Sequence, residues 1–417
     1  MLEKLVSGTP MTNSDKATNK QSVSVGESGC DVVGFSNRHL QCAVDQVSRL
    51  GGGIVELSEG VFHMADSLHV PSGLVIRGQG ERTVLRKNPM KAAKITTYLG
   101  YGLSDIEVET PDILDVGEGV ILTDDATGGY LDQAGTLLRR EGNTWFYSAR
   151  HSMDYDPTRN AVLKTLYSHI RIADAEDVLI EGLRIDGNPD QNDMMNSCRG
   201  GGVYVHSSRR VVVRDVIVRD YNGDGIVLGD CDDVELAGCV CEQCAGIGIH
   251  AGSASRNFVV TRCVLRDNSI GFFFCLQAQH GLLDECLFEN NETHGVSIGT
   301  RDSDNIIRNT VVRGNGGNGI HFRRCPRCSA PDRVTIEGCT IEDNAQRDGV
   351  AEILLQGEVD GVVVRNSSIR PGDGSPAILV RPETGSFQAI DNVYLPSSQN
   401  AIVDERRSDY AKFKPEF

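Results

Sequence analysis

The chain alternates apolar and polar residues in short runs that return at a nearly constant interval. Between residues 201 and 377, a Gly followed by apolar residues recurs, and successive glycines lie 23, 23, 23, 24, 24 and 30 residues apart. A fixed period of this size indicates supersecondary units stacked along an axis. The segments are Gly202-Val-Tyr-Val, Gly225-Ile-Val-Leu, Gly248-Ile-His-Ala, Gly271-Phe-Phe-Phe, Gly295-Val-Ser-Ile, Gly319-Ile-His-Phe and Gly349-Val-Ala-Glu.

Each repeat also holds two β-rich runs separated by Asn, Asp and Gly turns, such as residues 211–218 before Gly225. No repeat contains ten residues of helical periodicity, which excludes helical repeats. Val, Ile and Cys stand where a leucine-rich repeat would need Leu. The pattern therefore predicts an all-β solenoid, a parallel β-helix whose coils lie about 4.8 Å apart.

Two columns of similar residues support stacking in register, because parallel strands place equivalent positions above one another. We interpret both columns as structural, with small apolar residues inside and turn Asn residues bonding the next coil. The inward column is Val216, Cys239, Cys263, Cys286, Thr310, Cys339 and Ser367, and the turn column is Asn268, Asn290, Asn315 and Asn344.

A helix is expected over residues 37–50, because Leu40, Val44 and Val47 share one face and Gly51 follows. This helix would cap the open end of the solenoid. The only tryptophan and several short β-like pieces break the repeat before residue 170. The expected divisions are a disordered tail over 1–28, a cap and first coils over 29–94, an inserted β-rich flap over 95–170, regular coils over 171–400 and a C-terminal tail over 401–417.

Two phrases near the N-terminus carry a family resemblance. Glu59-Gly-Val-Phe and the Gly-x-Gly-x-x-Thr-x-Leu phrase over residues 78–85 follow three glycines and a strand. This arrangement resembles the opening of the pectate-lyase-like superfamily, which implies a right-handed β-helix. Further on, His294-Gly-Val-Ser-Ile-Gly and Asn222-Gly-Asp-Gly are similar to polygalacturonase phrases. The paired aspartates of that family would belong on the coil over 246–251, where this chain has none, so the resemblance implies fold more than reaction.

Composition narrows the partners and the setting. The formal charge of −17 argues against nucleic acid and anionic membrane surfaces. No run of eighteen apolar residues exists, and residues 1–21 lack an apolar core segment, so neither a membrane span nor a signal peptide is expected. With 13 cysteines, an odd number, this favours a reducing, cytoplasmic setting. No cofactor is expected, with calcium held by Asp groups as the alternative.

Alternation along each glycine-led strand separates an inward from an outward row. The outward row is Tyr204, Val227, His250, Phe273, Ser297, His321 and Ala351, and two places further on come His206, Gly229, Gly252, Cys275, Gly299 and Arg323. Solvated strands usually carry Thr, Lys and Glu, whereas this face is aromatic, His-rich and partly glycine. We interpret it as the floor of a sugar-binding groove, with an oligomer interface as the alternative.

Carboxylates near this floor are the acid/base candidates for glycosidic cleavage, which usually needs two carboxyl groups about 5 Å or about 6.5–9.5 Å apart. Asp224 and Asp302 lie three coils apart, about 14 Å along the axis, so Asp224 with the inserted loop 186–199 is the better pair. The catalytic candidates are Asp224, His250, Asp302, Asp190 and Asp193. The substrate-binding candidates are Tyr204, His206, Arg199, Phe273, His294, Ser297, Arg301, His321 and Arg323.

Three functions fit these residues. The leading hypothesis is cleavage of glycosidic bonds in an oligo- or polysaccharide with Asp acid/base groups. The second is a polysaccharide lyase or uronate epimerase, in which Arg and His groups steady an enolate while a base removes the proton beside a carboxylate. The third is a non-catalytic β-helix for glycan binding or for assembly into a homotrimer.

Overall fold

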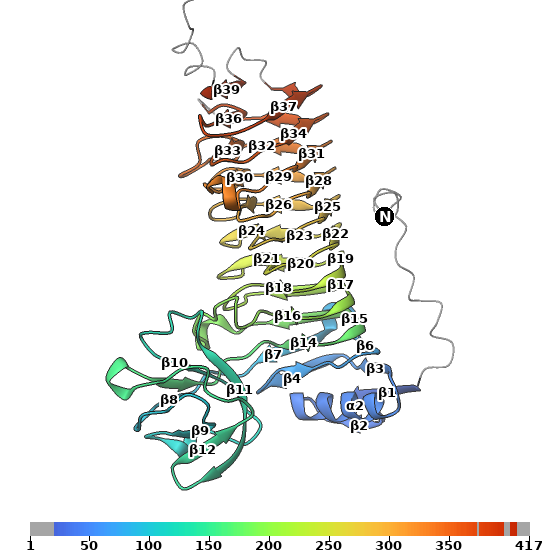
Figure 1. Ribbon diagram of the computed structural model, residues 1–417. Helices are drawn as coiled ribbons and strands as arrows, with labels where there is room; N and C mark the ends of the chain where they lie inside the picture. The colour runs from blue at the N-terminus through green and yellow to red at the C-terminus, as the bar shows by residue number, and fades with distance from the viewer. Residues whose placement is uncertain (1–20, 373–374, 396–400, 407–417) are drawn as a thin grey trace, which may run out of the picture.

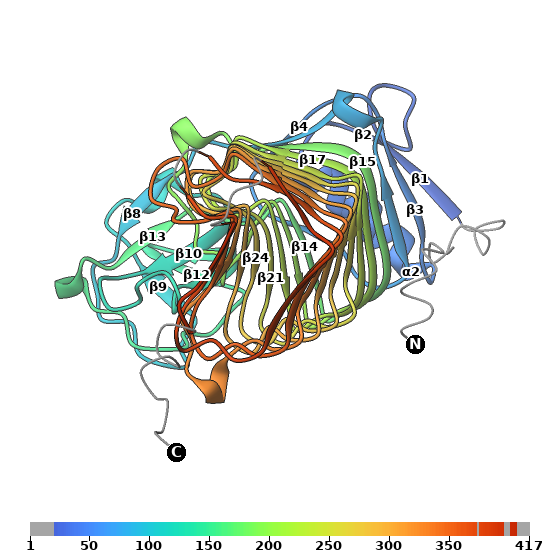
Figure 2. The same cartoon turned by 90° about the horizontal axis from the view of Figure 1, so that it is seen from above.

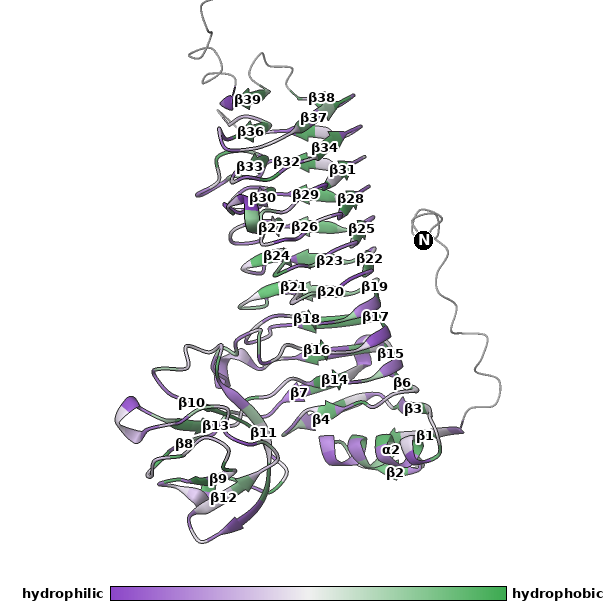
Figure 3. Ribbon diagram, viewed as in Figure 1, coloured by the Kyte–Doolittle hydropathy of each residue, from purple (hydrophilic) through white to green (hydrophobic). Residues whose placement is uncertain are grey.

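The computed structural model describes residues 21–372, 375–395 and 401–406, and it forms a solenoid of stacked coils with an appended sheet near its base (Figure 1). Viewed along the axis, the coils superpose around one interior (Figure 2). Hydrophobic residues follow the stacked strands, and hydrophilic residues gather at turns (Figure 3). The predicted all-β parallel β-helix is confirmed. Within the described ranges, no helix is both long and apolar enough to cross a membrane.

The glycine-led segments form one parallel 11-stranded sheet in which each strand pairs with its equivalents in the neighbouring coils. Val203 pairs with Ile226, which pairs with Ile249, so the predicted register is confirmed. From the N-terminal end, the strands are β5 (Leu68–His69), β14 (Ile170–Ala173), β16 (Val203–His206), β18 (Ile226–Gly229), β21 (Ile247–Gly252), β24 (Ile270–Phe274), β27 (Val296–Ile298), β30 (Ile320–Phe322), β33 (Ile353–Leu355), β36 (Ile378–Val380) and β39 (Ile402–Asp404).

The remaining coil strands join one 22-stranded sheet that bends around the solenoid. In the body it contains β15 (Glu176–Asp186), β17 (Arg209–Arg219), β19 (Asp232–Ala237), β20 (Val240–Glu242), β22 (Val259–Thr261), β23 (Val264–Arg266), β25 (Leu282–Asp284), β26 (Leu287–Glu289), β28 (Ile306–Arg308), β29 (Val311–Arg313), β31 (Thr335–Glu337), β32 (Thr340–Glu342), β34 (Val362–Arg365), β35 (Ser368–Arg370), β37 (Phe387–Ile390) and β38 (Val393–Tyr394). Each coil thus turns through two strands here and one in the 11-stranded sheet.

The last predicted glycine-led segment is out of register by three residues. Ile320 pairs with Ile353 and His321 with Leu354, so Val350 and Ala351 precede the strand. The turn before β33 is longer than in the other coils, and it lets the buried carboxyl of Glu352 approach the turn Asn column.

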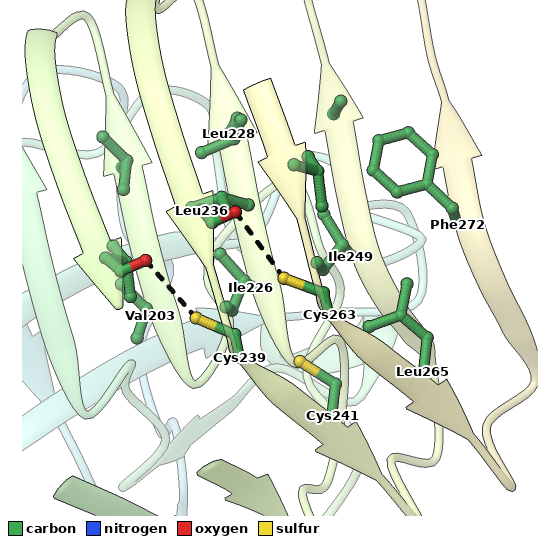
Figure 4. Packing of buried hydrophobic residues seen from close by; sticks show 14 of the residues in the cluster. Val203, Ile226, Leu228, Leu236, Cys239, Cys241, Ile249, Cys263, Leu265 and Phe272 are labelled. Carbon is green, nitrogen blue, oxygen red and sulfur yellow. Dashed lines mark hydrogen bonds between the residues drawn. The ribbon is translucent and has the colours of Figure 1, made fainter. Parts of the chain in front are cut away.

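The inward cysteine column is confirmed, and its thiols form hydrogen bonds within the core. Its thiols are buried, and each donates to a carbonyl of the preceding coil; the Cys263 thiol donates to Leu236 at 3.6 Å, as Figure 4 shows. Cys239 donates to Val213 at 3.4 Å in the same way. All 13 cysteines are free thiols. The thiols of this column therefore fill the space of small apolar side chains and also hydrogen-bond one coil to the next.

The turn Asn column is confirmed except that Asn291, and not Asn290, belongs to it. Asn290 precedes it in a left-handed turn with φ of 56°, which Asn tolerates better than most residues. The side-chain Nδ2 of Asn268 donates to Asn291 at 3.2 Å, Asn291 donates to Asn315 at 2.9 Å, and Asn315 donates to Asn344 at 2.7 Å. The chain of amides ends where Asn344 donates to the Glu352 carboxyl.

Replacing Asn291 with Ala is expected to lower the free energy of unfolding by about 2 kcal/mol. The Asn291 oxygen accepts the backbone N–H of Asn268 at 3.1 Å, and this buried donor would lose its partner. Urea unfolding followed by circular dichroism measures the change. Glu292→Ala, at an exposed turn position beside it, is the matched control and should change stability by less than about 0.5 kcal/mol. Equal effects in both variants would contradict a structural amide ladder.

A column of alternating charge runs up one edge of the 22-stranded sheet. Arg266 bonds Glu242 at 2.6 Å, and Arg313 bonds Glu289 at 2.7 Å. In both pairs a largely exposed arginine meets a carboxylate whose side chain is nearly buried. Strand register places the charge column in the order Arg86, Asp186, Arg219, Glu242, Arg266, Glu289, Arg313, Glu342 and Arg370.

The predicted capping helix is confirmed as α2 (Asn37–Arg49), which buries Leu40, Val44 and Val47 against the first coils. The first coils comprise β1 (Gln21–Gly26), β2 (Val32–Val33), β3 (Gly53–Leu57), β4 (Gly60–Met64), β6 (Leu74–Arg77) and β7 (Thr83–Lys87).

Both predicted tails need correction where the structure describes them. Within the expected tail 1–28, residues 1–20 lie outside the described residues, but β1 pairs in parallel with β3 because Val23 and Val25 alternate inward between serines. Within the expected tail 401–417, residues 407–417 lie outside the described residues, but β39 pairs with β36 and extends the 11-stranded sheet by one coil.

An antiparallel six-stranded sheet interrupts the coils between β7 and β14 and has its own core around Trp145 and Tyr155. Backbone and side-chain contacts hold it against the solenoid; for example, Thr136 Oγ1 bonds Asp66 at 2.7 Å. Its strands are β8 (Ala92–Lys94), β9 (Asp105–Glu107), β10 (Gly119–Thr123), β11 (Gln133–Glu141), β12 (Thr144–Tyr147) and β13 (Val162–Lys164).

Candidate functional site

The outward face of the 11-stranded sheet gathers most of the predicted site residues. Register places Tyr204, Val227, His250, Phe273, Ser297 and His321 in one row, one coil apart. The side chains pack against one another along the axis: the His250 and Phe273 rings meet edge-on at 5.2 Å, and the Arg323 guanidinium lies 4.1 Å from the Phe273 centroid. Consequently the face is a packed polar surface in which His250 is only 8% exposed.

Asp224 and His250 form a buried ion pair at one end of the stretch of this surface from β21 to β30, two coils above Tyr204. His250 Nδ1 lies 2.9 Å from Asp224 Oδ2, and Asp224 Oδ1 accepts the backbone N–H of Ile247 at 2.8 Å. Burial lowers the pKa of His250, but hydrogen bonds to Asp224 and Cys275 outweigh it and raise the pKa to about 9. At neutral pH the imidazole is therefore a cation held by a carboxylate.

Arg323 and Asp302 form a second pair at the other end. Arg323 Nη2 lies 3.3 Å from Asp302 Oδ2 and donates to the Phe274 carbonyl at 2.8 Å, while Nη1 donates to Ser297 at 2.9 Å. Asp302 is fully buried and also accepts the N–H groups of Gly299 and Ala278. Burial raises the pKa of Asp302 to about 6, against the lowering effect of Arg323. The carboxylate lies behind the guanidinium and fixes its position.

The His294 and His321 rings pack at a tilt of 51°, with their centroids 4.1 Å apart. Burial, together with the nearby Arg323 charge, lowers the pKa of His294 to about 4. Burial, together with the charges of His294 and Arg323, lowers the pKa of His321 to about 3. Both imidazoles are thus neutral at pH 7. His294 Nδ1 accepts the N–H of Asn318 at 3.0 Å, and His321 Nε2 lies 2.8 Å from the Gln356 amide.

Cys275 lies between the two cations, and the candidate list from the sequence lacked it. It occupies the outward row of Gly252, Gly299 and Arg323. A Cβ at Gly252 would lie 3.2 Å from His250 Nε2, and one at Gly299 would overlap the Arg323 guanidinium. The two glycines therefore leave room for His250 and Arg323 to reach toward the thiol from opposite sides. The sequence feature that could have indicated Cys275 is the presence of glycine at the equivalent position in both neighbouring coils.

Tyr204 and His206 lie on the same face, two coils below His250. Their rings stack at 5.8 Å, and the Arg171 guanidinium lies 5.0 Å from the Tyr204 ring. The Tyr204 hydroxyl donates to the Cys198 carbonyl at 3.5 Å, which connects this part of the face to loop 186–199. These aromatic residues extend the surface toward the six-stranded sheet.

The other predicted residues have different partners. Asp193 bonds Lys164 at 2.6 Å, and Asp190 is exposed in the 3-10 turn Pro189–Gln191, so the expected pairing of Asp224 with a loop carboxylate is replaced by the pairing with His250. Arg199 donates to the Tyr130 carbonyl at 2.8 Å and ties loop 186–199 to the six-stranded sheet. Arg301 is exposed in a left-handed turn with φ of 62°. Across the described ranges, no group of three or more His, Cys, Asp or Glu side chains has the arrangement of a metal site.

Residues 201–369 match the family model described as "Right handed beta helix region". Among solved structures, the A-module of mannuronan C-5 epimerase AlgE4 from Azotobacter vinelandii aligns with a TM-score of 0.53 and 16% identity over 89% of this chain and 96% of that one. Polygalacturonase from Erwinia carotovora aligns with a TM-score of 0.54 and 12% identity over 93% of this chain and 97% of the enzyme. The chain therefore has the fold of a right-handed parallel β-helix, which is the fold that the resemblance to the pectate-lyase-like superfamily implies.

A sequence similarity is confined to part of the chain. Mannuronan C5-epimerase AlgE1 of Azotobacter vinelandii is 29% identical over 114 residues, which are 27% of this chain and 8% of the epimerase. AlgE5 of the same organism is 28% identical over 113 residues, 27% of this chain and 11% of that enzyme.

Proposed function

We propose that the protein binds a polysaccharide containing uronic acids and removes the proton on the carbon beside the uronate carboxylate. The observation that carries this proposal is the pair of cations on the outward face, protonated His250 and Arg323, each backed by its own buried carboxylate. A surface that presents cations and keeps their counter-charges behind them suits an anionic sugar.

The chemistry needs a positive group to steady the charge that develops on the carboxylate when the proton leaves. Arg323 provides a planar guanidinium, and its contacts to Ser297, Phe274 and Asp302 hold it in place. Fixed charges of this kind cost no reorganisation during the reaction. The local similarity to proteins named mannuronan C5-epimerases supports the same class, since epimerisation begins with this proton transfer.

Hydrolysis with two aspartates receives less support than it had from the sequence. Asp224 is 3% exposed and Asp302 is 0% exposed, and both carboxylates are occupied by a cation and by backbone donors. An inverting or retaining glycosidase needs both carboxyl groups open to the sugar. We therefore favour proton abstraction, with epimerisation as the outcome and elimination as its variant.

Incubation with polyuronates in D2O tests this proposal. Epimerisation is expected to place deuterium on the carbon beside the carboxylate without shortening the chain, as read by NMR. Elimination would instead shorten the chain and create a conjugated double bond that absorbs in the ultraviolet. New reducing ends with neither signal would identify a hydrolase, and binding without any of the three would identify a glycan-binding protein; either result would overturn the proposal.

A further inference from the structure

The thiol of Cys275 lies between the two cations of the face, at the position that a base acting on a bound uronate would occupy. In the outward row it is the direct neighbour of Gly252 on one side and is followed by Gly299 on the other. His250 reaches over the first glycine and Arg323 over the second. Asp224 holds Nδ1 of His250, and Nε2 of the same ring lies beside Gly252, the neighbour of Cys275 in the row.

Access separates Cys275 from the other basic groups of the site. Nδ1 of His321 is buried, Asp302 is fully buried, and Nδ1 of His294 already accepts the N–H of Asn318. Cys275 is only partly buried and belongs to the outward row of the sheet. The buried cysteines of the inward column, by contrast, donate to carbonyls and are closed to solvent.

We propose that Cys275, placed between the His250 imidazolium and the Arg323 guanidinium, is the base that takes the proton from the uronate. This inference rests on the proposed function. The C–H bond breaks, its proton passes to Sγ of Cys275, and its electron pair moves into the carboxylate held by Arg323. A proton from water added to the opposite face gives the epimer; expulsion of the neighbouring glycosidic oxygen, which takes a proton from water, gives the elimination product. In both cases Sγ then returns its proton to solvent.

A thiolate between two cations follows from elementary electrostatics. A nearby imidazolium or guanidinium favours the charged form of a thiol and lowers its pKa. The charged and titratable groups around Cys275 are His250 and Asp224 behind it on the β18 and β21 side, Arg323 with Asp302 behind it on the β27 and β30 side, and Cys198 from loop 186–199.

Alkylation of the intact protein by iodoacetamide, followed by mass spectrometry of the Cys275 peptide, measures the thiolate without any substrate. At pH 6 the wild-type Cys275 is expected to react at least about 10-fold faster than an ordinary thiol, whose pKa is about 8.5. Asp224→Asn should reduce that rate about 10-fold, because the imidazolium loses its carboxylate. Cys328→Ser, at an exposed cysteine away from the face, is the control and should leave the Cys275 profile unchanged.

Deuterium exchange into a polyuronate measures the catalytic role. Cys275→Ser is expected to reduce exchange by about 100- to 10,000-fold while circular dichroism and thermal unfolding stay close to the wild type, because a hydroxyl is a far weaker base. If the wild-type protein exchanges deuterium and Cys275→Ser exchanges it at a rate within a few-fold, this inference alone would be overturned. A Cys275 alkylation profile like that of an ordinary thiol would also overturn it. Absence of exchange by the wild-type protein would overturn the proposed function and, with it, the catalytic role of the thiolate.

Discussion

Replacing Arg323 with Met is expected to reduce turnover of a polyuronate strongly and to lower the free energy of unfolding by about 3–5 kcal/mol. The two effects have different origins. Turnover falls by about 100- to 1000-fold because the group that steadies the developing charge is gone. Stability falls because Asp302, which is fully buried, loses the cation 3.3 Å away and is left as an unpaired buried charge.

A second substitution separates these effects. Arg323→Met combined with Asp302→Asn removes the unpaired charge, so part of the lost stability is expected to return, but turnover is not. Arg324→Met is the matched control: its side chain is 76% exposed and pairs only at the surface with Glu383, so both readouts should stay near the wild type. Urea unfolding and the deuterium assay provide the measurements. Full activity in the stabilised double variant would remove Arg323 from the mechanism.

Glu352 is expected to make the protein lose stability as the pH rises from about 4.5 to 7. Burial raises the pKa of this carboxyl to about 7, even though donors from Asn344 act in the opposite direction. The protonated form is thus favoured in the folded state, so its contribution is fully present below the unfolded pKa and is lost as the pH rises through the folded one. A shift of this size corresponds to about 3 kcal/mol between pH 4 and pH 8.

Glu352→Gln tests this directly, because glutamine does not titrate. The difference in unfolding free energy between the variant and the wild type should change by about 3 kcal/mol in favour of the variant between pH 4 and pH 8. Glu358→Gln, at an exposed carboxyl nearby, should show no such change. Comparing differences at each pH cancels the other titrating groups. A difference that is flat with pH would mean that Glu352 is not held protonated in the fold.

The repeat could be predicted from the sequence because its physical cause is local. Alternation, β-branched residues and a glycine every 23 or 24 residues define both the strands and their stacking. Prediction fails where the period breaks. The longer turn before Glu352 shifts the strand register, and the alternating residues of β1 lie in a segment that is polar overall. These elements depend on pairing with distant strands, which local pattern does not reveal.

The candidate site could be predicted in part. Residues such as His250, Ser297 and Arg323 were found because stacking puts equivalent positions on one face. Their partners were not found, since Asp224 was assigned to loop carboxylates and Cys275 was passed over between glycines. Which nearby groups actually bond depends on side-chain reach across coils, as in the contact of His250 with Asp224, and a one-dimensional pattern does not contain that distance.

The charge column alternates in sign from one coil to the next. Since its sign reverses at every coil, excising one coil from the middle would set arginine on arginine or carboxylate on carboxylate at the junction, whereas excising two adjacent coils would restore attraction. The solenoid is therefore modular in pairs of coils. Insertion or deletion of an even number of coils should therefore be tolerated better than insertion or deletion of an odd number.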